Sequence, residues 1–315
     1  MADWTASDIP SQRGRTAIIT GTGGLGFEAA LALARAGAKV VLAGRNVLKG
    51  YAAVDRILRE VLGAQVRFEL LDLASLASVE DFAARMACSV DRVDLLINNA
   101  AVMAPPRREL TTDGFELQFG TNYLGHFALT AHLLPLLCNG VAPRVVSLSS
   151  VAARSGAIRF DDLQSRHDYK AMQAYGQSKL ACLMFAFELQ RRSEAGGWGL
   201  RSIAAHPGIA RTDLLPNGAG AWSGAAMARS LLWFLFQPAA QGALPTLFAA
   251  TAPEARGGAY YGPDRLGETR GHPVAARVPD QALVLEAAAR LWNESERLSA
   301  VDCALAPEAA MRRVI

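Results

Sequence analysis

Two side chains that could exchange a proton, Tyr175 and Lys179, stand four residues apart in a segment expected to be helical, and Ser149-Ser150 closes an apolar run upstream. Side chains at this spacing lie on the same face of a helix. A phenol, with a pKa of about 10, is a poor base at neutral pH unless a nearby cation favours the phenolate. A unit charge about 4 Å away, at an effective dielectric of about 20, is worth roughly 4 kcal/mol, or roughly 3 pK units. The pair therefore indicates an acid/base centre, although an exposed tyrosine and lysine on a helix would show the same spacing.

A glycine-rich turn follows the first expected strand and leads into an alanine-rich helical segment. Its glycines fit the pattern G-x-G-x-x-G, which between a strand and a helix is typical of dinucleotide binding. Glycine permits a tight turn and lets backbone N–H groups approach a pyrophosphate, whose charge is favoured by the positive end of the next helix. A merely structural turn is the alternative. The residues expected to bind the dinucleotide are Gly21, Thr22, Gly23, Gly24, Leu25 and Gly26.

The end of the second expected strand bears on the choice of dinucleotide. An NAD site usually places an acidic residue there to bind the ribose 2′-hydroxyl, but this chain has Gly44, Arg45 and Asn46. The planar guanidinium of Arg45 could bind a 2′-phosphate, a charge-assisted contact worth roughly 1.5 to 3 kcal/mol. The sequence thus favours NADP(H) over NAD(H), unless Arg45 stacks on adenine or faces solvent.

Short apolar runs alternate with longer helical patterns, which predicts an α/β fold: a doubly wound, Rossmann-like parallel sheet of about seven strands with helices on both faces. The expected strands are residues 16–20, 38–43, 65–70, 93–97, 144–148, 200–205 and 258–261, and the expected helices include 24–36, 46–62, 73–89 and 279–298. No linker divides this pattern. We expect a single domain over residues 1–315, with a substrate-covering insertion near 213–236 and a C-terminal helical extension over 279–315.

The composition limits the classes of function. A net charge of +3 from 32 basic and 29 acidic residues is too balanced to indicate nucleic-acid binding. The longest apolar segment, residues 225–236, contains Arg229 and is shorter than the roughly 20 residues that a transmembrane helix needs. The four cysteines and the dispersed histidines show no disulfide framework or metal-ligand spacing, so we expect no metal, a reducing cytoplasmic location, and structural roles for His126, His167, His206 and His272.

The order of these motifs resembles the short-chain dehydrogenase/reductase family over nearly the whole chain. The residues that carry the resemblance are the glycine loop, Asn98-Asn99-Ala100, Ser149-Ser150, the Tyr175/Lys179 pair and Pro207-Gly208. Within the family, the segments Arg45-Asn46, Asn122 to Phe127 and His206-Pro207-Gly208 look most like the retinol dehydrogenase and protochlorophyllide reductase branch.

The resemblance implies a catalytic role for four residues. Tyr175 would be the general acid in carbonyl reduction and the base in alcohol oxidation, while Lys179 would lower its pKa and hold the nicotinamide ribose. Ser150 would polarise the substrate oxygen; it is preferred to Ser149 because the second serine of the pair normally has this role in the family. Asn122 would help to hold a water that relays protons toward Lys179, although alone it could be an ordinary helical asparagine.

The resemblance also implies further cofactor contacts. Asp72 would contact adenine and Leu73 would contribute its backbone, although Asp72 could equally cap a helix. Asn99 and Ala100 would line the cofactor ribose. The nicotinamide carboxamide would be held by Pro207, Gly208, Ile209 and Thr212. The chain departs from the family in two places. Its glycine loop is one residue shorter than the common TGxxxGxG, and Ala101 replaces the glycine of Asn-Asn-Ala-Gly.

Together these features predict an NADP(H)-dependent carbonyl reductase or alcohol dehydrogenase acting on a small molecule. Aromatic residues of the insertion suggest a lipophilic substrate, although core packing would explain them equally: Trp222, Trp233, Phe234 and Phe236. A carbon–carbon double-bond reductase and a catalytically silent NADP(H)-binding regulator are the alternatives. The family resemblance also implies that the chain could form a homo-oligomer.

Overall fold

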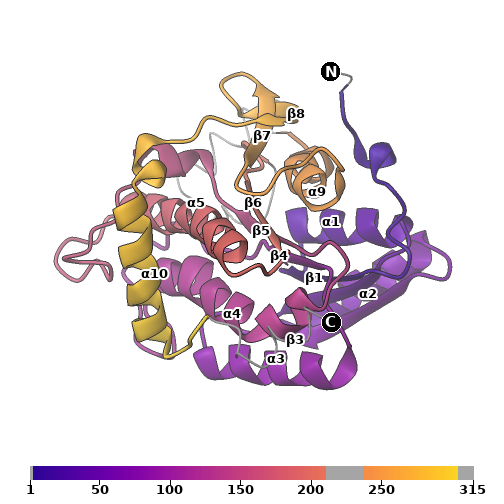
Figure 1. Ribbon diagram of the computed structural model, residues 1–315, viewed down its shortest axis with the longest axis horizontal. Helices are drawn as coiled ribbons and strands as arrows, with labels where there is room; N and C mark the ends of the chain where they lie inside the picture. Colours follow the sequence, from indigo (N-terminus) through magenta and orange to yellow (C-terminus); the bar gives the residue numbers. More distant parts are fainter. Residues whose placement is uncertain (1–2, 211–236, 304–315) are drawn as a thin grey trace.

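One eight-stranded sheet organises the computed structural model, which describes residues 3–210 and 237–303 (Figure 1). The strand order is β3-β2-β1-β4-β5-β6-β7-β8. Strands β1 to β7 run parallel, and β8 pairs with β7 in the antiparallel direction. The strands are β1 (Thr16–Thr20), β2 (Lys39–Gly44), β3 (Gln65–Leu70), β4 (Leu95–Asn98), β5 (Arg144–Leu148), β6 (Arg201–Ala205), β7 (Tyr260–Arg265) and β8 (Arg270–Ala275).

The doubly wound topology is confirmed, with one strand more than the sequence predicted. The chain leaves β1 toward β2 and β3 and then crosses back to place β4 on the other side of β1. Such a reversal opens a crevice beyond the carboxyl ends of the strands, where sheets of this type bind ligands. The strand β8 was missed because Gly271 and Pro273 interrupt it, which disfavours a strand prediction. Proline is tolerated there because β8 is an edge strand.

Helices cover both faces of the sheet (Figure 1). They are α1 (Gly24–Arg35), α2 (Val47–Glu60), α3 (Leu76–Ser89), α4 (Gly125–Cys138), α5 (Ala171–Ala195), α8 (Ala239–Gly242), α9 (Leu244–Thr251) and α10 (Leu285–Ser299). A π-helix, η2 (Phe119–Leu124), leads into α4, and 3-10 turns form η1 (Ala6–Asp8), η3 (Val151–Ser155) and η5 (Asp280–Leu283).

Two hydrophobic cores follow from the alternation of side chains along the strands. Ile18 belongs to the core beneath α3, α4, α5 and α10, whereas its neighbour Ile19 belongs to the core beneath α1, α2 and α9. Trp292 of α10 is 1% exposed and stacks on Phe185 of α5. The described part of the C-terminal extension is therefore packed onto the first of these cores.

Several sequence predictions fall at or beyond the limits of the described residues. The expected insertion over 213–236, Thr212 and the last residues of the extension lie outside them. The expected helix over 279–298 is divided into η5 and α10. Among the helices that are described, none is both long and apolar enough to cross a membrane, and no three potential metal ligands gather within the described ranges.

Candidate active site

The acid/base pair lies on the buried side of α5, where the helix passes the carboxyl end of β5. Tyr175 is 5% exposed and Lys179 is 3% exposed, so the alternative of an exposed pair is wrong. The Lys179 Nζ donates a hydrogen bond to the carbonyl oxygen of Leu148, the last residue of β5, over 3.0 Å. It also lies 5.9 Å from the centroid of the Tyr175 ring. The helix α5 therefore positions Lys179 next to Tyr175 at the carboxyl end of β5.

Burial sets the protonation state of this pair. Desolvation raises the pKa of Tyr175 to about 12, although a hydrogen bond with Ser150 acts in the opposite direction. Desolvation also lowers the pKa of Lys179. Removing the phenolate from water costs more than the Ser150 hydrogen bond returns, and the expectation that Lys179 lowers the pKa of Tyr175 stays a prediction. At neutral pH the Tyr175 hydroxyl carries its proton.

The two serines after β5 make different contacts. Ser149 is buried, and its hydroxyl donates to the main-chain oxygen of Lys179 over 2.8 Å, which ties the end of β5 to α5. Ser150 is half-buried, precedes η3, and accepts a hydrogen bond from the Ala152 N–H. It is Ser150 that faces the Tyr175 hydroxyl. The structure thus brings Ser150, Tyr175 and Lys179 together and uses Ser149 as a support.

Asn122 lies in the π-helix η2 and is 1% exposed. Its side-chain oxygen accepts from the Val102 N–H over 2.7 Å, and its amide donates to the Val102 carbonyl over 2.9 Å and to the Ser178 hydroxyl over 3.0 Å. These contacts join the segment after β4 to α5 next to Lys179. An ordinary helical asparagine would not carry this set of partners, and π-helical turns are frequent at functional sites.

His126, which sequence analysis treated as structural, continues this network toward the glycine loop. Its Nδ1 lies 2.9 Å from the main-chain oxygen of Asn122, and its Nε2 lies 2.8 Å from the Thr20 hydroxyl. Because a carbonyl can only accept, Nδ1 must carry the proton and Nε2 must accept from Thr20. Burial lowers the pKa of His126 to about 4, consistent with a neutral ring. The Thr20 oxygen in turn accepts from the N–H groups of Asn99 and Ala100, each over 2.9 Å.

The glycine loop has a shape that suits a pyrophosphate. Gly21 adopts φ +93° and Gly24 φ +51°, conformations that favour glycine. At Gly26 an added Cβ would collide with the Gly21 carbonyl, so this glycine lets α1 pack against the loop. Gly23 differs, because a Cβ there would meet no atom of the described residues within 4 Å. The open space beside Gly23 and the N-terminal end of α1, where Gly24 and Leu25 carry first-turn N–H groups, together fit an anionic group of a dinucleotide.

Cations rather than acids stand at the tip of β2. Arg45 is exposed, and within the described part of the chain its guanidinium has no hydrogen-bond or ion-pair partner. Asn46 caps α2 by accepting from the Lys49 N–H over 2.9 Å, which places a second cation in the first turn. This end of the crevice therefore presents two positive side chains and a helix N-terminus.

Asp72 and Leu73 follow β3. The Asp72 carboxylate accepts a hydrogen bond from the Ala74 N–H over 3.0 Å. The backbone N–H of Asp72 donates to the Ser78 hydroxyl over 3.0 Å. The cap of α3 is Ser75, so the alternative that Asp72 is a helix N-cap is wrong. Asp72 is half-buried at the carboxyl edge of the sheet, whereas the Leu73 side chain is 7% exposed and belongs to the core.

The segment after β6 forms a turn against the β7–β8 hairpin. Gly208 adopts φ +63°, and Ile209 donates to the Thr269 carbonyl over 2.8 Å. The Gln237 side chain donates to the Pro207 carbonyl over 2.6 Å. Three of the four residues expected to grip the carboxamide are therefore held at the carboxyl edge, while Thr212 is not described.

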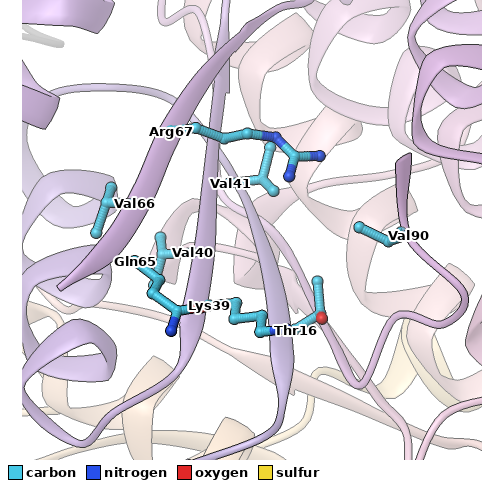
Figure 2. A pocket seen from close by; sticks show the side chains of 8 residues that line it. All are labelled: Thr16, Lys39, Val40, Val41, Gln65, Val66, Arg67 and Val90. Atoms are coloured by element: carbon cyan, nitrogen blue, oxygen red, sulfur yellow. The ribbon is translucent and has the colours of Figure 1, made fainter. Parts of the chain in front are cut away.

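A hollow at the amino ends of the strands is separate from this site. It measures about 260 Å³, and Figure 2 shows that its side chains come from the first halves of β1, β2 and β3 and from Val90 after α3. None of the predicted site residues lines it. Its lining residues are Thr16, Lys39, Val40, Val41, Gln65, Val66, Arg67 and Val90.

Comparison with known proteins finds relatives that match most of this chain. The sequence profile of the short chain dehydrogenase family matches residues 15–219. Retinol dehydrogenase 13 of Mus musculus is 43% identical over 294 residues, which cover 90% of this chain and 84% of the relative. Polyprenol dehydrogenase of Mus musculus is 40% identical over 303 residues, covering 94% and 87%. The crystal structure of an uncharacterized protein from Mycobacterium paratuberculosis is 40% identical, covers 96% of this chain and all of its own, and superposes with a TM-score of 0.80.

Proposed function

The chain belongs to the short chain dehydrogenase family, and from this membership we propose that it is an NADP(H)-dependent oxidoreductase interconverting the carbonyl and alcohol forms of a lipophilic small molecule. The observation that carries this proposal is the cluster of Ser150, Tyr175 and Lys179 beside a glycine loop with room for a pyrophosphate. A bound nicotinamide cofactor would supply the hydride.

The residues of this chain would manage the proton and the substrate oxygen. In reduction, Tyr175 donates its hydroxyl proton to the oxygen as the carbonyl carbon is reduced, because burial keeps that hydroxyl protonated at neutral pH. Ser150 donates a hydrogen bond to the same oxygen. The Lys179 ammonium, which donates one hydrogen to Leu148, has two more donors for cofactor ribose hydroxyls and for the charge that develops on Tyr175. Asn122 holds α5 and the segment after β4 at a constant distance.

NADP(H) is proposed because of the charges at the tip of β2. A 2′-phosphate would meet the exposed guanidinium of Arg45 and the ammonium of Lys49 at the N-terminus of α2. The end of β2, where an NAD site usually carries an acid, here has Gly44 and Arg45. The remaining contacts would come from Asp72 and Leu73 at adenine, and from Asn99, Ala100, Pro207, Gly208, Ile209 and Thr212 nearer the nicotinamide.

A lipophilic substrate is proposed from the relatives. Two of them are named for acting on retinol and polyprenol, which are long apolar alcohols, and they match at least 90% of this chain. Ile209 is 37% exposed at the edge of the crevice, where it could contact an apolar chain. The four free cysteines support a reducing compartment such as the cytoplasm.

The test is turnover by the purified full chain with NADPH and NADH. Absorbance of the reduced nicotinamide would be followed with long-chain isoprenoid aldehydes, steroid ketones, enones and sugars, and product analysis would separate an alcohol from a saturated ketone. We expect aldehydes or ketones of low polarity to be reduced to alcohols with NADPH. Turnover of sugars alone would contradict the proposed substrate class, and NADPH binding without any turnover would favour a regulator.

The role of Tyr175 is tested by Tyr175→Phe. Loss of the general acid should lower kcat by about 10²- to 10⁴-fold and leave NADPH binding intact. Tyr261→Phe is the matched control, because Tyr261 is also buried but its hydroxyl accepts from the Arg256 N–H in the other core. Full activity of Tyr175→Phe would remove this residue from the mechanism.

A further inference from the structure

Glu268, in the turn between β7 and β8, is bonded to three separate segments. Its Oε2 lies 2.9 Å from the Nε2 of His206 and 2.6 Å from the Nη2 of Arg154. Its Oε1 accepts from the Arg277 N–H over 2.9 Å. The residue adopts φ +68°, a conformation that is unfavourable for a residue with a side chain and persists where surrounding contacts impose it.

The contact with His206 extends to the turn after β6. The Gly208 N–H donates to the Nδ1 of His206 over 3.2 Å. Because this N–H can only donate, Nδ1 must be unprotonated and Nε2 must carry the hydrogen that Glu268 accepts. The adjacent Thr269 carbonyl accepts from Ile209, and an added Cβ at Gly208 would collide with it. The turn that holds Pro207, Gly208 and Ile209 is thus laid directly on the hairpin turn.

The contact with Arg154 extends to the serine. Arg154 lies in η3, the 3-10 turn that begins directly after Ser150, and its Nη1 also donates to the Gly267 carbonyl over 3.2 Å. Tyr260 packs its ring 5.1 Å from that of His206, and its hydroxyl lies 3.5 Å from the main-chain oxygen of Ser150. The hairpin therefore touches the serine segment from two directions.

We infer that Glu268 is a positioning residue that joins the His206–Ile209 turn to the η3 turn and so fixes the distance between the nicotinamide end of the crevice and the Ser150 hydroxyl. This inference rests on the proposed function, since it assigns these two turns to the cofactor and to the substrate oxygen. No part of the connection reaches the tip of β2, so the adenine end of the crevice should be independent of Glu268.

The charges around Glu268 stabilise its contacts with His206 and Arg154. Burial lowers the pKa of His206, so its ring is neutral at neutral pH. Although partial burial opposes it, hydrogen bonds from His206 and Arg277 and the charge of Arg154 lower the pKa of Glu268. The carboxylate is only 19% exposed, so it is less screened by water than a surface ion pair. Without it, the His206 Nε2–H and the Arg154 guanidinium would face each other with no acceptor between them.

The experiment compares two ligands in Glu268→Ala. NADPH spans both ends of the crevice, whereas adenosine 2′,5′-bisphosphate occupies only the adenine end. We expect the variant to bind NADPH about tenfold more weakly or worse, which corresponds to about 1.4 kcal/mol, and to bind the bisphosphate as the wild type does. Where turnover is measured, kcat should fall together with NADPH affinity. Glu268→Gln, which keeps an oxygen acceptor but loses the charge, should lie between Glu268→Ala and wild type.

Glu294→Ala is the matched control, because Glu294 also pairs with an arginine, Arg297, but within α10. It should change neither affinity. Equal weakening of both ligands in Glu268→Ala would show a general structural defect, and unchanged NADPH binding would show no connection; either result overturns the inference. If wild-type protein binds NADPH but reduces no carbonyl, the proposed function fails while the two-ligand comparison still decides the role of Glu268. Glu268→Gln supplies the same comparison if Glu268→Ala does not fold.

Discussion

The hydroxyl of Thr20 is the point where the glycine loop, the segment after β4 and His126 meet, so its removal should be costly. Thr20→Val replaces the hydroxyl with a methyl group of similar size and leaves little change in packing volume. The N–H groups of Asn99 and Ala100 lose their acceptor, and the Nε2 of His126 loses its donor.

The expected cost follows from the number of groups left unpaired. Leaving one buried polar group without a partner costs about 1 to 3 kcal/mol. Thr20 is 0% exposed, but Asn99 and Ala100 are only half-buried, so water can offset part of the loss at their N–H groups. We therefore expect Thr20→Val to lower the free energy of unfolding by about 2 to 4 kcal/mol. Thr20→Ser keeps the oxygen and removes one methyl group, which should cost about 1 kcal/mol.

Urea denaturation at neutral pH measures both variants on the same scale. The decisive quantity is the difference between them, because it separates the hydrogen bonds from the packing of the methyl group. Thr20→Val should also weaken NADPH binding, since Asn99 and Ala100 are expected to line the cofactor ribose. If Thr20→Val proves as stable as Thr20→Ser, the hydroxyl does not hold this junction and the network through His126 does not contribute to stability.

Three further perturbations test other parts of the site. Arg45→Asp should weaken NADPH binding by about ten- to hundredfold and leave NADH binding unchanged or improved, as measured by nicotinamide fluorescence; a preserved preference for NADPH would show that another residue binds the phosphate. Gly23→Ala should fold normally, because its φ is −130° and its Cβ would meet no atom of residues 3–210 or 237–303 within 4 Å, yet it should weaken cofactor binding by occupying the open space. Burial lowers the pKa of His126 from its ordinary value of 6.5 to about 4 in the folded chain, so the unfolded state binds a proton first as the pH falls. The contribution of the neutral His126 ring to the free energy of unfolding is complete above pH 6.5 and is lost as the pH falls toward 4. The largest loss is roughly 3 kcal/mol. A His126→Gln variant should lose less stability over the same pH range if the ring is responsible.

The sheet was predictable from sequence because its strands are apolar runs bounded by turn residues. The ranges 16–20, 65–70 and 144–148 coincide with β1, β3 and β5. The fold and the location of the glycine loop follow from this regular alternation. The edge strand β8 could not be predicted in this way, because its stability comes from pairing with β7 rather than from a local pattern.

The two histidines show where local reasoning ends. His126 contacts Thr20 across 106 positions of sequence and His206 contacts Glu268 across 62, so neither partner is visible in a short segment. A weaker signal was present in both cases. His126 stands one helical turn after Asn122, and His206 directly precedes Pro207-Gly208. A polar residue adjacent to a functional motif is thus a better candidate for a support than an isolated one, even without a metal-ligand pattern.

The pKa of Tyr175 shows what spacing alone leaves out of the acid/base pair. The Coulomb estimate counted the attraction between a phenolate and an ammonium but not the cost of taking both from water. In the folded chain that cost dominates, and it raises the pKa of Tyr175 to about 12 while lowering that of Lys179. The two shifts have the same main cause, because desolvation disfavours the charged form of each group. Relative to an ordinary phenol of pKa 10.0, deprotonation is harder by roughly 3 kcal/mol. Burial therefore keeps Tyr175 protonated, as a general acid for carbonyl reduction must be, but the phenolate left after proton donation needs stabilisation that burial does not provide.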